Sequence, residues 1–352
     1  MKTSSYARSV AWALFKLAPA LAIIVLVSSS RTADYQFAAE RLLSKDNHYG
    51  YINYDERAFQ SIIARRLQTP VTVLVAGSSR TMQLDSNCFD GLSYNASVSG
   101  AMISDIAAII EQFRRGRHLK QVVIAADPWM LNGFAQSEAW DGARIAPNLE
   151  RMQAAPDWIR VQLRLGLMPS WRDFMAAARA ELNPIRGMLA PASFHAALTI
   201  RAEFAPASHL YRKQPDGGLT MPESVLNLPN AQVTQAALNM ADLHLEKLYT
   251  GFRTIDPFLA KAFAAITTDL KINGIRVTLV LAPFHPLYYE RVIHSDGGGL
   301  LPEAEAYFRR LGNDVIGSYD PAEAGAVAAD FFDGVHMKRN PLQHLYGCRE
   351  TR

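Results

Sequence analysis

Val71-Thr-Val-Leu-Val-Ala-Gly-Ser-Ser-Arg80 begins as a nearly continuous apolar, β-branched run and ends in a glycine followed by two serines and an arginine. Such a run suits a strand that is buried on both faces of a parallel sheet. The glycine allows a tight backbone turn directly after the strand. We therefore predict a buried parallel strand over residues 71–76 and a sharp strand-to-turn junction at Gly77.

Similar strands follow this one along the chain. Short apolar runs predict strands over 92–95, 122–126 and 277–282, and prolines stop the last two. Between them, residues 102–114 carry isoleucines on one face at helical spacing. Strands that alternate with helices predict an α/β fold, a doubly wound parallel sheet in three α/β/α layers.

Composition excludes several classes of protein. The 352 residues are 49% hydrophobic and 20% charged, the usual balance of a folded globular chain. The net charge of +3 is spread along the sequence, so a nucleic-acid partner is not expected. Neither the ligand spacing of a metal site nor the glycine pattern of a dinucleotide-binding turn occurs, so we expect no metal and no cofactor.

The amino-terminal residues predict export. Basic side chains precede an apolar stretch at 10–27, which Lys16 interrupts. We predict that residues 1–30 form a signal anchor or a cleavable signal peptide, and we favour the uncleaved membrane helix. Either form places the chain from Arg31 onward outside the cytoplasm, in the periplasm. In an oxidising compartment the two cysteines, Cys88 and Cys348, can pair or stay free.

The exported part divides into three regions. Residues 31–69 have polar helical patterning and predict a linker between the anchor and a domain at 70–352. Within that domain the strand signal disappears over 132–235, which predicts a largely helical insertion. Because the insertion follows the carboxyl end of a strand, it is either a lid or substrate platform, or a structural cap.

Three separated segments carry residues suited to acyl chemistry. Ser79 follows the first strand, although a serine there is more often a helix cap. Gly100 lies in the loop after the second strand, where its backbone N–H can approach a ligand oxygen. Asp333 and His336 are three residues apart, so the carboxylate can hold one imidazole nitrogen while the other faces a nucleophile.

Together and in this order, these segments resemble the SGNH (GDSL-type) hydrolase superfamily. The resemblance covers the sheet-forming parts of the chain, from Val71 to Ala126 and from Val277 to His344, and the stretch Asn95-Ala-Ser-Val-Ser-Gly100 is a close match to the second block of that family. It implies Ser79 as the nucleophile, Asp333 and His336 as its catalytic partners, and the backbone N–H groups of Ser79 and Gly100 as the oxyanion hole.

The chain departs from this family at two positions. Ser78 stands where the family has an aspartate, and Asp127 stands where the family has an asparagine that donates to the oxyanion. Losing one such donor typically costs about 100- to 1,000-fold in rate. The second departure is similar to what membrane-tethered cell-envelope acyl-transfer proteins show, including the lipoteichoic acid D-alanylation protein and the alginate O-acetylation proteins.

The resemblance implies a membrane-anchored serine O-acyl esterase or acyltransferase. Its expected substrate carries acetyl groups on envelope or exported polysaccharide, and a membrane acyltransferase is its candidate partner. The alternative, favoured by Asp127, is a non-catalytic SGNH-like protein that binds polymer and assembles with a membrane acyltransferase.

Three further polar side chains are candidates for substrate binding. Arg80 can fix an anionic group of a polymer or form an ion pair that holds its loop. Asp127 can bind a substrate hydroxyl or form a turn. His285, after the fourth strand, can face the same crevice or serve as a packed or capping histidine.

Overall fold

The computed structural model describes residues 38–46, 48–50, 56–115, 117–135 and 211–348. The expected anchor at 1–30, and the greater part of the expected insertion at 132–235, lie outside these ranges. Within them, no helix combines the length and apolar character needed to cross a bilayer.

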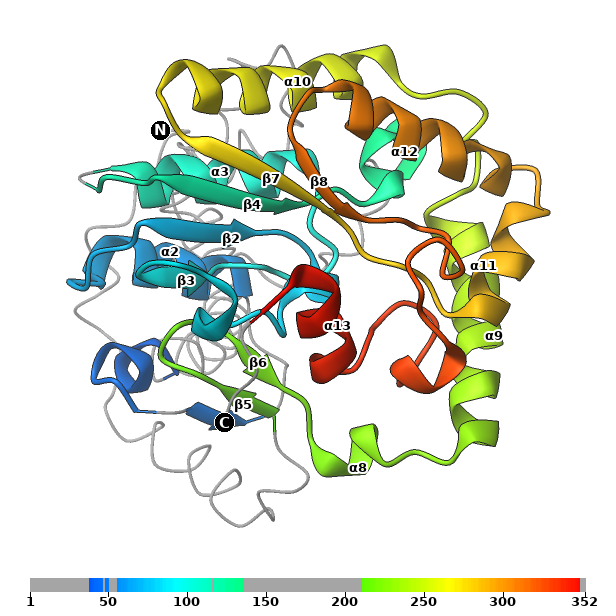
Figure 1. The fold of residues 1–352 in the computed structure, drawn as a ribbon, viewed down its shortest axis with the longest axis horizontal. Helices are drawn as coiled ribbons and strands as arrows, with labels where there is room; N and C mark the ends of the chain where they lie inside the picture. Colours follow the sequence, from blue (N-terminus) through cyan, green and yellow to red (C-terminus); the bar gives the residue numbers. More distant parts are fainter. Residues whose placement is uncertain (1–37, 47, 51–55, 116, 136–210, 349–352) are drawn as a thin grey trace, which may run out of the picture.

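A sheet of five parallel strands forms the centre of the molecule (Figure 1). Its strands, in spatial order, are β3 (Ser93–Asn95), β2 (Val73–Ala76), β4 (Gln121–Ala125), β7 (Arg276–Leu281) and β8 (Asp314–Gly317). The α/β fold with a parallel sheet is thus confirmed. The first strand of the sheet lies between the second and the third, and at such a switch in strand order ligands bind beyond the carboxyl ends of the strands.

Both faces of the central strands are buried, as their apolar runs predict. Leu74 and Ala76 point into the larger core, whereas Val73 and Val75 point into a smaller core on the opposite face. Because successive side chains of a strand alternate between faces, a run without polar interruptions fills both cores.

Helices cover the sheet and the edge where its strands end. In chain order they are α2 (Glu56–Arg66), α3 (Ile103–Arg114), α8 (Glu223–Leu226), α9 (Asn230–Lys247), α10 (Pro257–Ile272), α11 (Pro286–Ile293), α12 (Leu301–Arg310) and α13 (Arg339–Tyr346). Buried side chains of α2, α3, α10 and α12 pack into the larger core. The smaller core is closed by α13 and the loop before it. In Figure 1, α9 and α11 lie beyond the arrowheads of the parallel strands.

A second, antiparallel sheet differs from the sequence-based expectation. It joins β1 (His48–Gly50), β5 (Tyr211–Lys213) and β6 (Leu219–Thr220). Residues 31–69 were expected to form a helical linker, yet they contribute β1 to this sheet and buried side chains such as Phe59 and Ile62 to the larger core. Likewise, β5 and β6 lie in the region expected to be helical. Strands of two or three residues are too short for a periodic pattern to reveal them.

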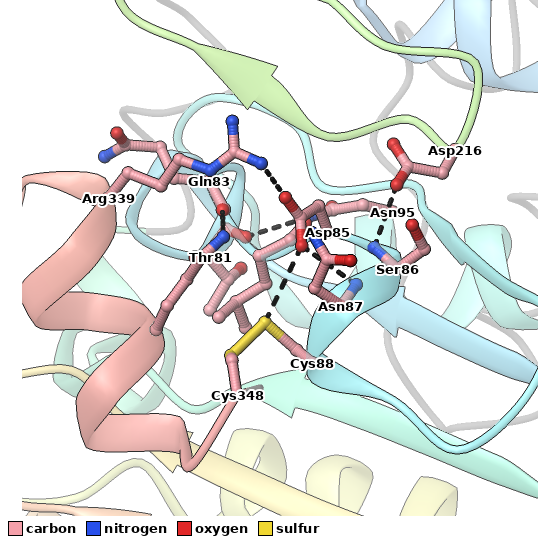
Figure 2. Close-up of a disulfide and its surroundings, with 12 residues drawn as sticks. Thr81, Gln83, Asp85, Ser86, Asn87, Cys88, Asn95, Asp216, Arg339 and Cys348 are labelled. Carbon is pink, nitrogen blue, oxygen red and sulfur yellow. Dashed lines mark hydrogen bonds and ion pairs between the residues drawn. A yellow bond between two sulfur atoms is a disulfide. The ribbon is translucent and has the colours of Figure 1, made fainter. Parts of the chain in front are cut away.

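A disulfide links the two cysteines of the chain. Cys88 lies shortly after the turn that follows β2, and Cys348 follows α13 (Figure 2). Beside this bond, Arg339 of α13 forms an ion pair with the buried carboxylate of Asp85. The carboxyl-terminal helix is therefore fastened, covalently and electrostatically, to the loop after the first strand of the sheet.

Candidate active site

The sequence around Ser79 folds into a tight turn because only a glycine fits before it. A Cβ added at Gly77 would lie 2.5 Å from both the Ala125 Cβ and the Thr81 Oγ1. The chain then enters a single 3-10 turn, Ser79–Thr81, in which the Arg80 N–H donates to the Ser78 hydroxyl, the cap of the turn, at 3.2 Å. The turn leaves the Ser79 side chain partly exposed at the carboxyl end of β2.

The structure brings Ser79, His336 and Asp333 into one hydrogen-bonded chain. The Ser79 Oγ lies 2.8 Å from the His336 Nε2, and the His336 Nδ1 lies 2.7 Å from the Asp333 Oδ2. The carboxylate accepts a hydrogen bond from the Nδ1–H group, which leaves Nε2 as the acceptor for the serine O–H. The geometry is that of a nucleophile, a general base and a group that orients the base.

The carboxylate of Asp333 is held by its own loop. Its Oδ1 accepts hydrogen bonds from the backbone N–H groups of Val335 and His336, each at 2.8 Å. Burial raises the pKa of Asp333, but the charge of His336, the hydrogen bond from its ring and the two backbone donors outweigh burial and lower the pKa below its ordinary value. Asp333 is therefore ionised at neutral pH and can stabilise an imidazolium.

Two hydrogen bonds bring the loop that carries Gly100 alongside the turn that carries Ser79. The Val98 N–H donates to the Gly77 carbonyl at 2.9 Å, and the hydroxyls of Ser97 and Thr81 lie 3.0 Å apart. Gly100 has a φ of +57°, which glycine adopts without strain. Within the described ranges, no acceptor is bonded to the backbone N–H of Ser79 or of Gly100. These are the two donors that the resemblance assigns to an oxyanion hole.

Asn95 explains why the second segment has this sequence. Its side-chain amide donates to the carbonyls of Thr81 and Leu84, both at 2.8 Å, and its Oδ1 accepts from the Ser97 N–H at 3.0 Å. Figure 2 shows the Asn95 side chain pointing toward Thr81. The buried amide thus ties the turn that carries Ser79 to the loop that carries Gly100.

Arg80 and Asp127 form a buried ion pair. The Arg80 Nη1 lies 2.8 Å from the Asp127 Oδ1, and both side chains are at most 2% exposed. Arg80 also donates to the carbonyls of Val335, Ala282 and Pro283, and its guanidinium lies 3.9 Å from the Phe284 ring centre. Neither residue is placed to bind substrate. The pair instead fastens the Asp333–His336 loop to the strand ends.

His285 occupies a structural position. It is the N-cap of α11, its Nδ1 accepts a hydrogen bond from the Leu287 N–H at 3.1 Å, and it is 1% exposed. Burial lowers its pKa, although the charge of Asp333 opposes this shift. Seven site residues were named from the sequence. The structure brings together Ser79, Asp333, His336 and the loop of Gly100. The other three, Arg80, Asp127 and His285, are buried and support these segments.

Two side chains near the triad were not predicted from the sequence. Phe332 stacks on the His336 ring, with ring centres 5.5 Å apart and planes 4° from parallel. His244 of α9 is held through its Nδ1 by the Tyr288 hydroxyl at 2.8 Å. Burial, followed by the charges of His336 and Arg80, lowers the pKa of His244 to about 4, so it is neutral at neutral pH. Phe332 directly precedes Asp333, so the sequence could have indicated that it lies near the triad. The spacing of residues in α9 does not distinguish His244 from other helix residues.

The described residues hold no cluster of histidine, cysteine, aspartate or glutamate arranged to bind a metal ion. No model of a known protein family matches the chain, and no curated protein matches it in sequence.

Proposed function

We propose that this protein is a serine O-acyl esterase or acyltransferase that works through an acyl-enzyme on Ser79. The observation that carries the proposal is the continuous hydrogen-bonded chain from the Ser79 hydroxyl through His336 to Asp333, with contacts of 2.8 and 2.7 Å. An imidazole bonded to both a partly exposed serine and a carboxylate is how hydrolases activate a hydroxyl.

The mechanism follows from the residue types. The Ser79 oxygen attacks an ester carbonyl while His336 Nε2 takes its proton, and the new oxyanion accepts hydrogen bonds from the N–H groups of Ser79 and Gly100. Collapse breaks the bond to the leaving alcohol, which receives the proton from His336. Water, deprotonated by the same imidazole, then attacks the acyl-serine; the bond to the Ser79 oxygen breaks, this oxygen takes the proton back from His336, and the protein acts as an esterase. Attack by a sugar hydroxyl gives an acyltransferase.

The proposed location is the periplasmic side of a membrane, with residues 1–30 as the anchor. The Cys88–Cys348 disulfide supports an exported domain, since such bonds persist in oxidising compartments. The proposed substrates are acetyl esters of envelope or exported polysaccharide, which rest on the resemblance to cell-envelope acyl-transfer proteins. A membrane acyltransferase is the proposed partner for the transfer reaction.

A fluorophosphonate probe tests the proposal directly, because it reacts with an activated serine. We expect the purified domain to be labelled, the label to vanish in Ser79→Ala, and labelling to fall sharply in His336→Ala. The variant His294→Gln serves as a matched control, since it changes an exposed histidine at the end of α11 whose side chain pairs with Glu290 on the surface. Equal labelling of wild type and Ser79→Ala would contradict the proposal.

A second function is favoured by one observation, the carboxylate at position 127. Asp127 stands where the resembled family has an amide, and its carboxylate pairs with Arg80. A protein that kept this frame without catalysis would bind polymer for a membrane acyltransferase. Wild type that is folded and binds acetylated polysaccharide, yet takes up no probe and hydrolyses no ester, would support this function over the enzyme.

A further inference from the structure

We propose that Arg57 is a positioning residue for the oxyanion hole, acting through the peptide group that joins Ser99 to Gly100. This inference rests on the proposed function, because it assigns a second component to the same reaction. Arg57 lies on α2, in the segment that sequence patterning assigned to a linker, and neither the triad nor the resemblance involves it.

The contacts of α2 hold the oxyanion loop from both sides of Ser99. The Ser99 N–H donates to the carboxylate of Glu56, and the Ser99 carbonyl accepts a hydrogen bond from the Arg57 Nη2 at 3.4 Å. Two consecutive side chains of one helix thus anchor two consecutive peptide groups. Gly100, whose φ is +57°, is the next residue after this anchored pair.

Because the peptide group is planar, the hydrogen bond from Arg57 to the Ser99 carbonyl also orients the Gly100 N–H. The Ser99 carbonyl and the Gly100 N–H belong to one planar trans group, in which they point in opposite directions. A guanidinium that fixes the carbonyl therefore also fixes where the Gly100 N–H points. A cationic donor on the carbonyl polarises the group as well, which strengthens the N–H as a donor on its other side.

Arg57 is itself rigidly placed, which an anchor requires. Its Nε and Nη2 bond to the two carboxylate oxygens of Asp105 at 2.7 and 2.8 Å. The same carboxylate accepts from the Met102 N–H at 2.9 Å, at the start of α3. The loop between Ser99 and Met102 is therefore held at both ends by one Arg57–Asp105 pair. Donors that are oriented before the reaction stabilise an oxyanion without reorganisation during it.

The test compares Arg57→Gln and Arg57→Lys with a matched control, Arg114→Gln. Arg114 pairs with Glu111 and Asp269, and its side chain is 27% exposed against 22% for Arg57, so both variants remove an ion-paired arginine of similar exposure from the same side of the sheet. Turnover of a p-nitrophenyl acetate ester and inhibition by an aryl boronic acid are measured, and thermal unfolding checks the fold. The boronic acid forms a tetrahedral adduct on serine that occupies the oxyanion hole, so it reports transition-state binding.

We expect Arg57→Gln to lower kcat by about tenfold to 100-fold with little change in KM, less than the complete loss of an oxyanion donor. Boronic acid binding should weaken by the same factor as kcat/KM falls. Arg57→Lys should fall between wild type and Arg57→Gln, because it keeps the charge but not the fork that spans Asp105 and Ser99. Arg114→Gln should leave turnover and inhibition unchanged.

The outcomes separate the two proposals. If wild type reacts with ester and boronic acid and Arg57→Gln does so equally well, the positioning role is wrong and the proposed function stands. Equal losses of turnover in Arg57→Gln and Arg114→Gln, each in proportion to the decrease in unfolding temperature, would also overturn the positioning role. A folded wild type without turnover, adduct or label removes the proposed function and this inference with it.

Discussion

Replacing Asp127 by asparagine separates what the family resemblance implies from what the structure implies. By resemblance, the new amide would supply the missing oxyanion donor and raise turnover by about 100-fold or more. In the structure, Asp127 is bonded to Arg80 through Oδ1, and its Oδ2 is buried without a hydrogen-bond partner among the described residues. An amide nitrogen there does not reach a substrate. We therefore expect Asp127→Asn to give no gain in turnover.

The same change should destabilise the fold by a predictable amount. At 2.8 Å the attraction between the two groups is about 6 kcal/mol for an effective dielectric constant near 20, and desolvation of both charges offsets part of it. Breaking a buried pair typically costs about 3 to 5 kcal/mol. Arg80 keeps its bonds to the Val335 and Pro283 carbonyls and its contact with the Phe284 ring, so we expect about 3 kcal/mol, near the lower limit.

Urea unfolding and ester turnover, measured on the same preparations, check both expectations. The variants Arg80→Met, Asp127→Asn and their combination form a double-mutant cycle, in which the coupling energy should be at least about 2 kcal/mol. A loss below about 1 kcal/mol for Asp127→Asn would refute the argument from the buried pair. A rise in turnover would show that this side chain does reach the oxyanion.

Three further predictions concern stability. The double variant Cys88→Ser/Cys348→Ser removes a bond that spans 260 residues, and we expect it to unfold with about 2 to 5 kcal/mol less free energy in urea, whereas an unchanged midpoint would contradict this. Because the folded-state pKa of Asp333 is lowered, its carboxylate stabilises the fold above the unfolded value of about 3.8 and loses this contribution as pH falls through the folded value; the free-energy advantage of wild type over Asp333→Asn should therefore shrink as the pH falls below about pH 4. Burial lowers the pKa of Lys213 to about 8, so the unfolded chain binds more protons than the folded one between pH 8 and 10.5, and the free energy of unfolding of wild type should rise across that interval. Lys213→Met should remove this rise, and an identical pH profile for both proteins would contradict the lowered pKa of Lys213.

Most strands of the central sheet were predictable from the sequence because they are short apolar runs, several of which end at a glycine or a proline. The run that starts at Val71 became β2 over Val73–Ala76, and the prolines after the third and fourth runs follow β4 and β7 closely. By contrast, β8 (Asp314–Gly317) was not predicted, since it is a four-residue edge strand without a continuous apolar run. Short strands acquire their structure from the neighbour they pair with, which sequence periodicity does not contain.

The site was predictable in part for a different reason. Ser79, Asp333 and His336 were found because their spacing matched a known order of motifs. The sequence does not decide whether Arg80 binds substrate or forms an ion pair, because its partners include Pro283, which lies 203 residues away in the sequence. The sequence likewise gives no sign of the contact between Arg57 and Ser99, which lie 42 residues apart. Side chains that act through burial or through a distant carbonyl can be assigned only once the fold brings their partners together.

The 257 residues that separate Ser79 from His336 have a consequence for biosynthesis. At the usual elongation rate of about 5 to 20 residues per second, a ribosome needs about 13 to 51 s to travel from the codon for the serine to that for the histidine. A chain whose synthesis stops before residue 333 carries the hydroxyl but not the imidazole and carboxylate that activate it. Under the proposed mechanism, unfinished copies are consequently inert toward esters, and only copies in which the loop of Asp333 and His336 has been made and joined to the sheet can react.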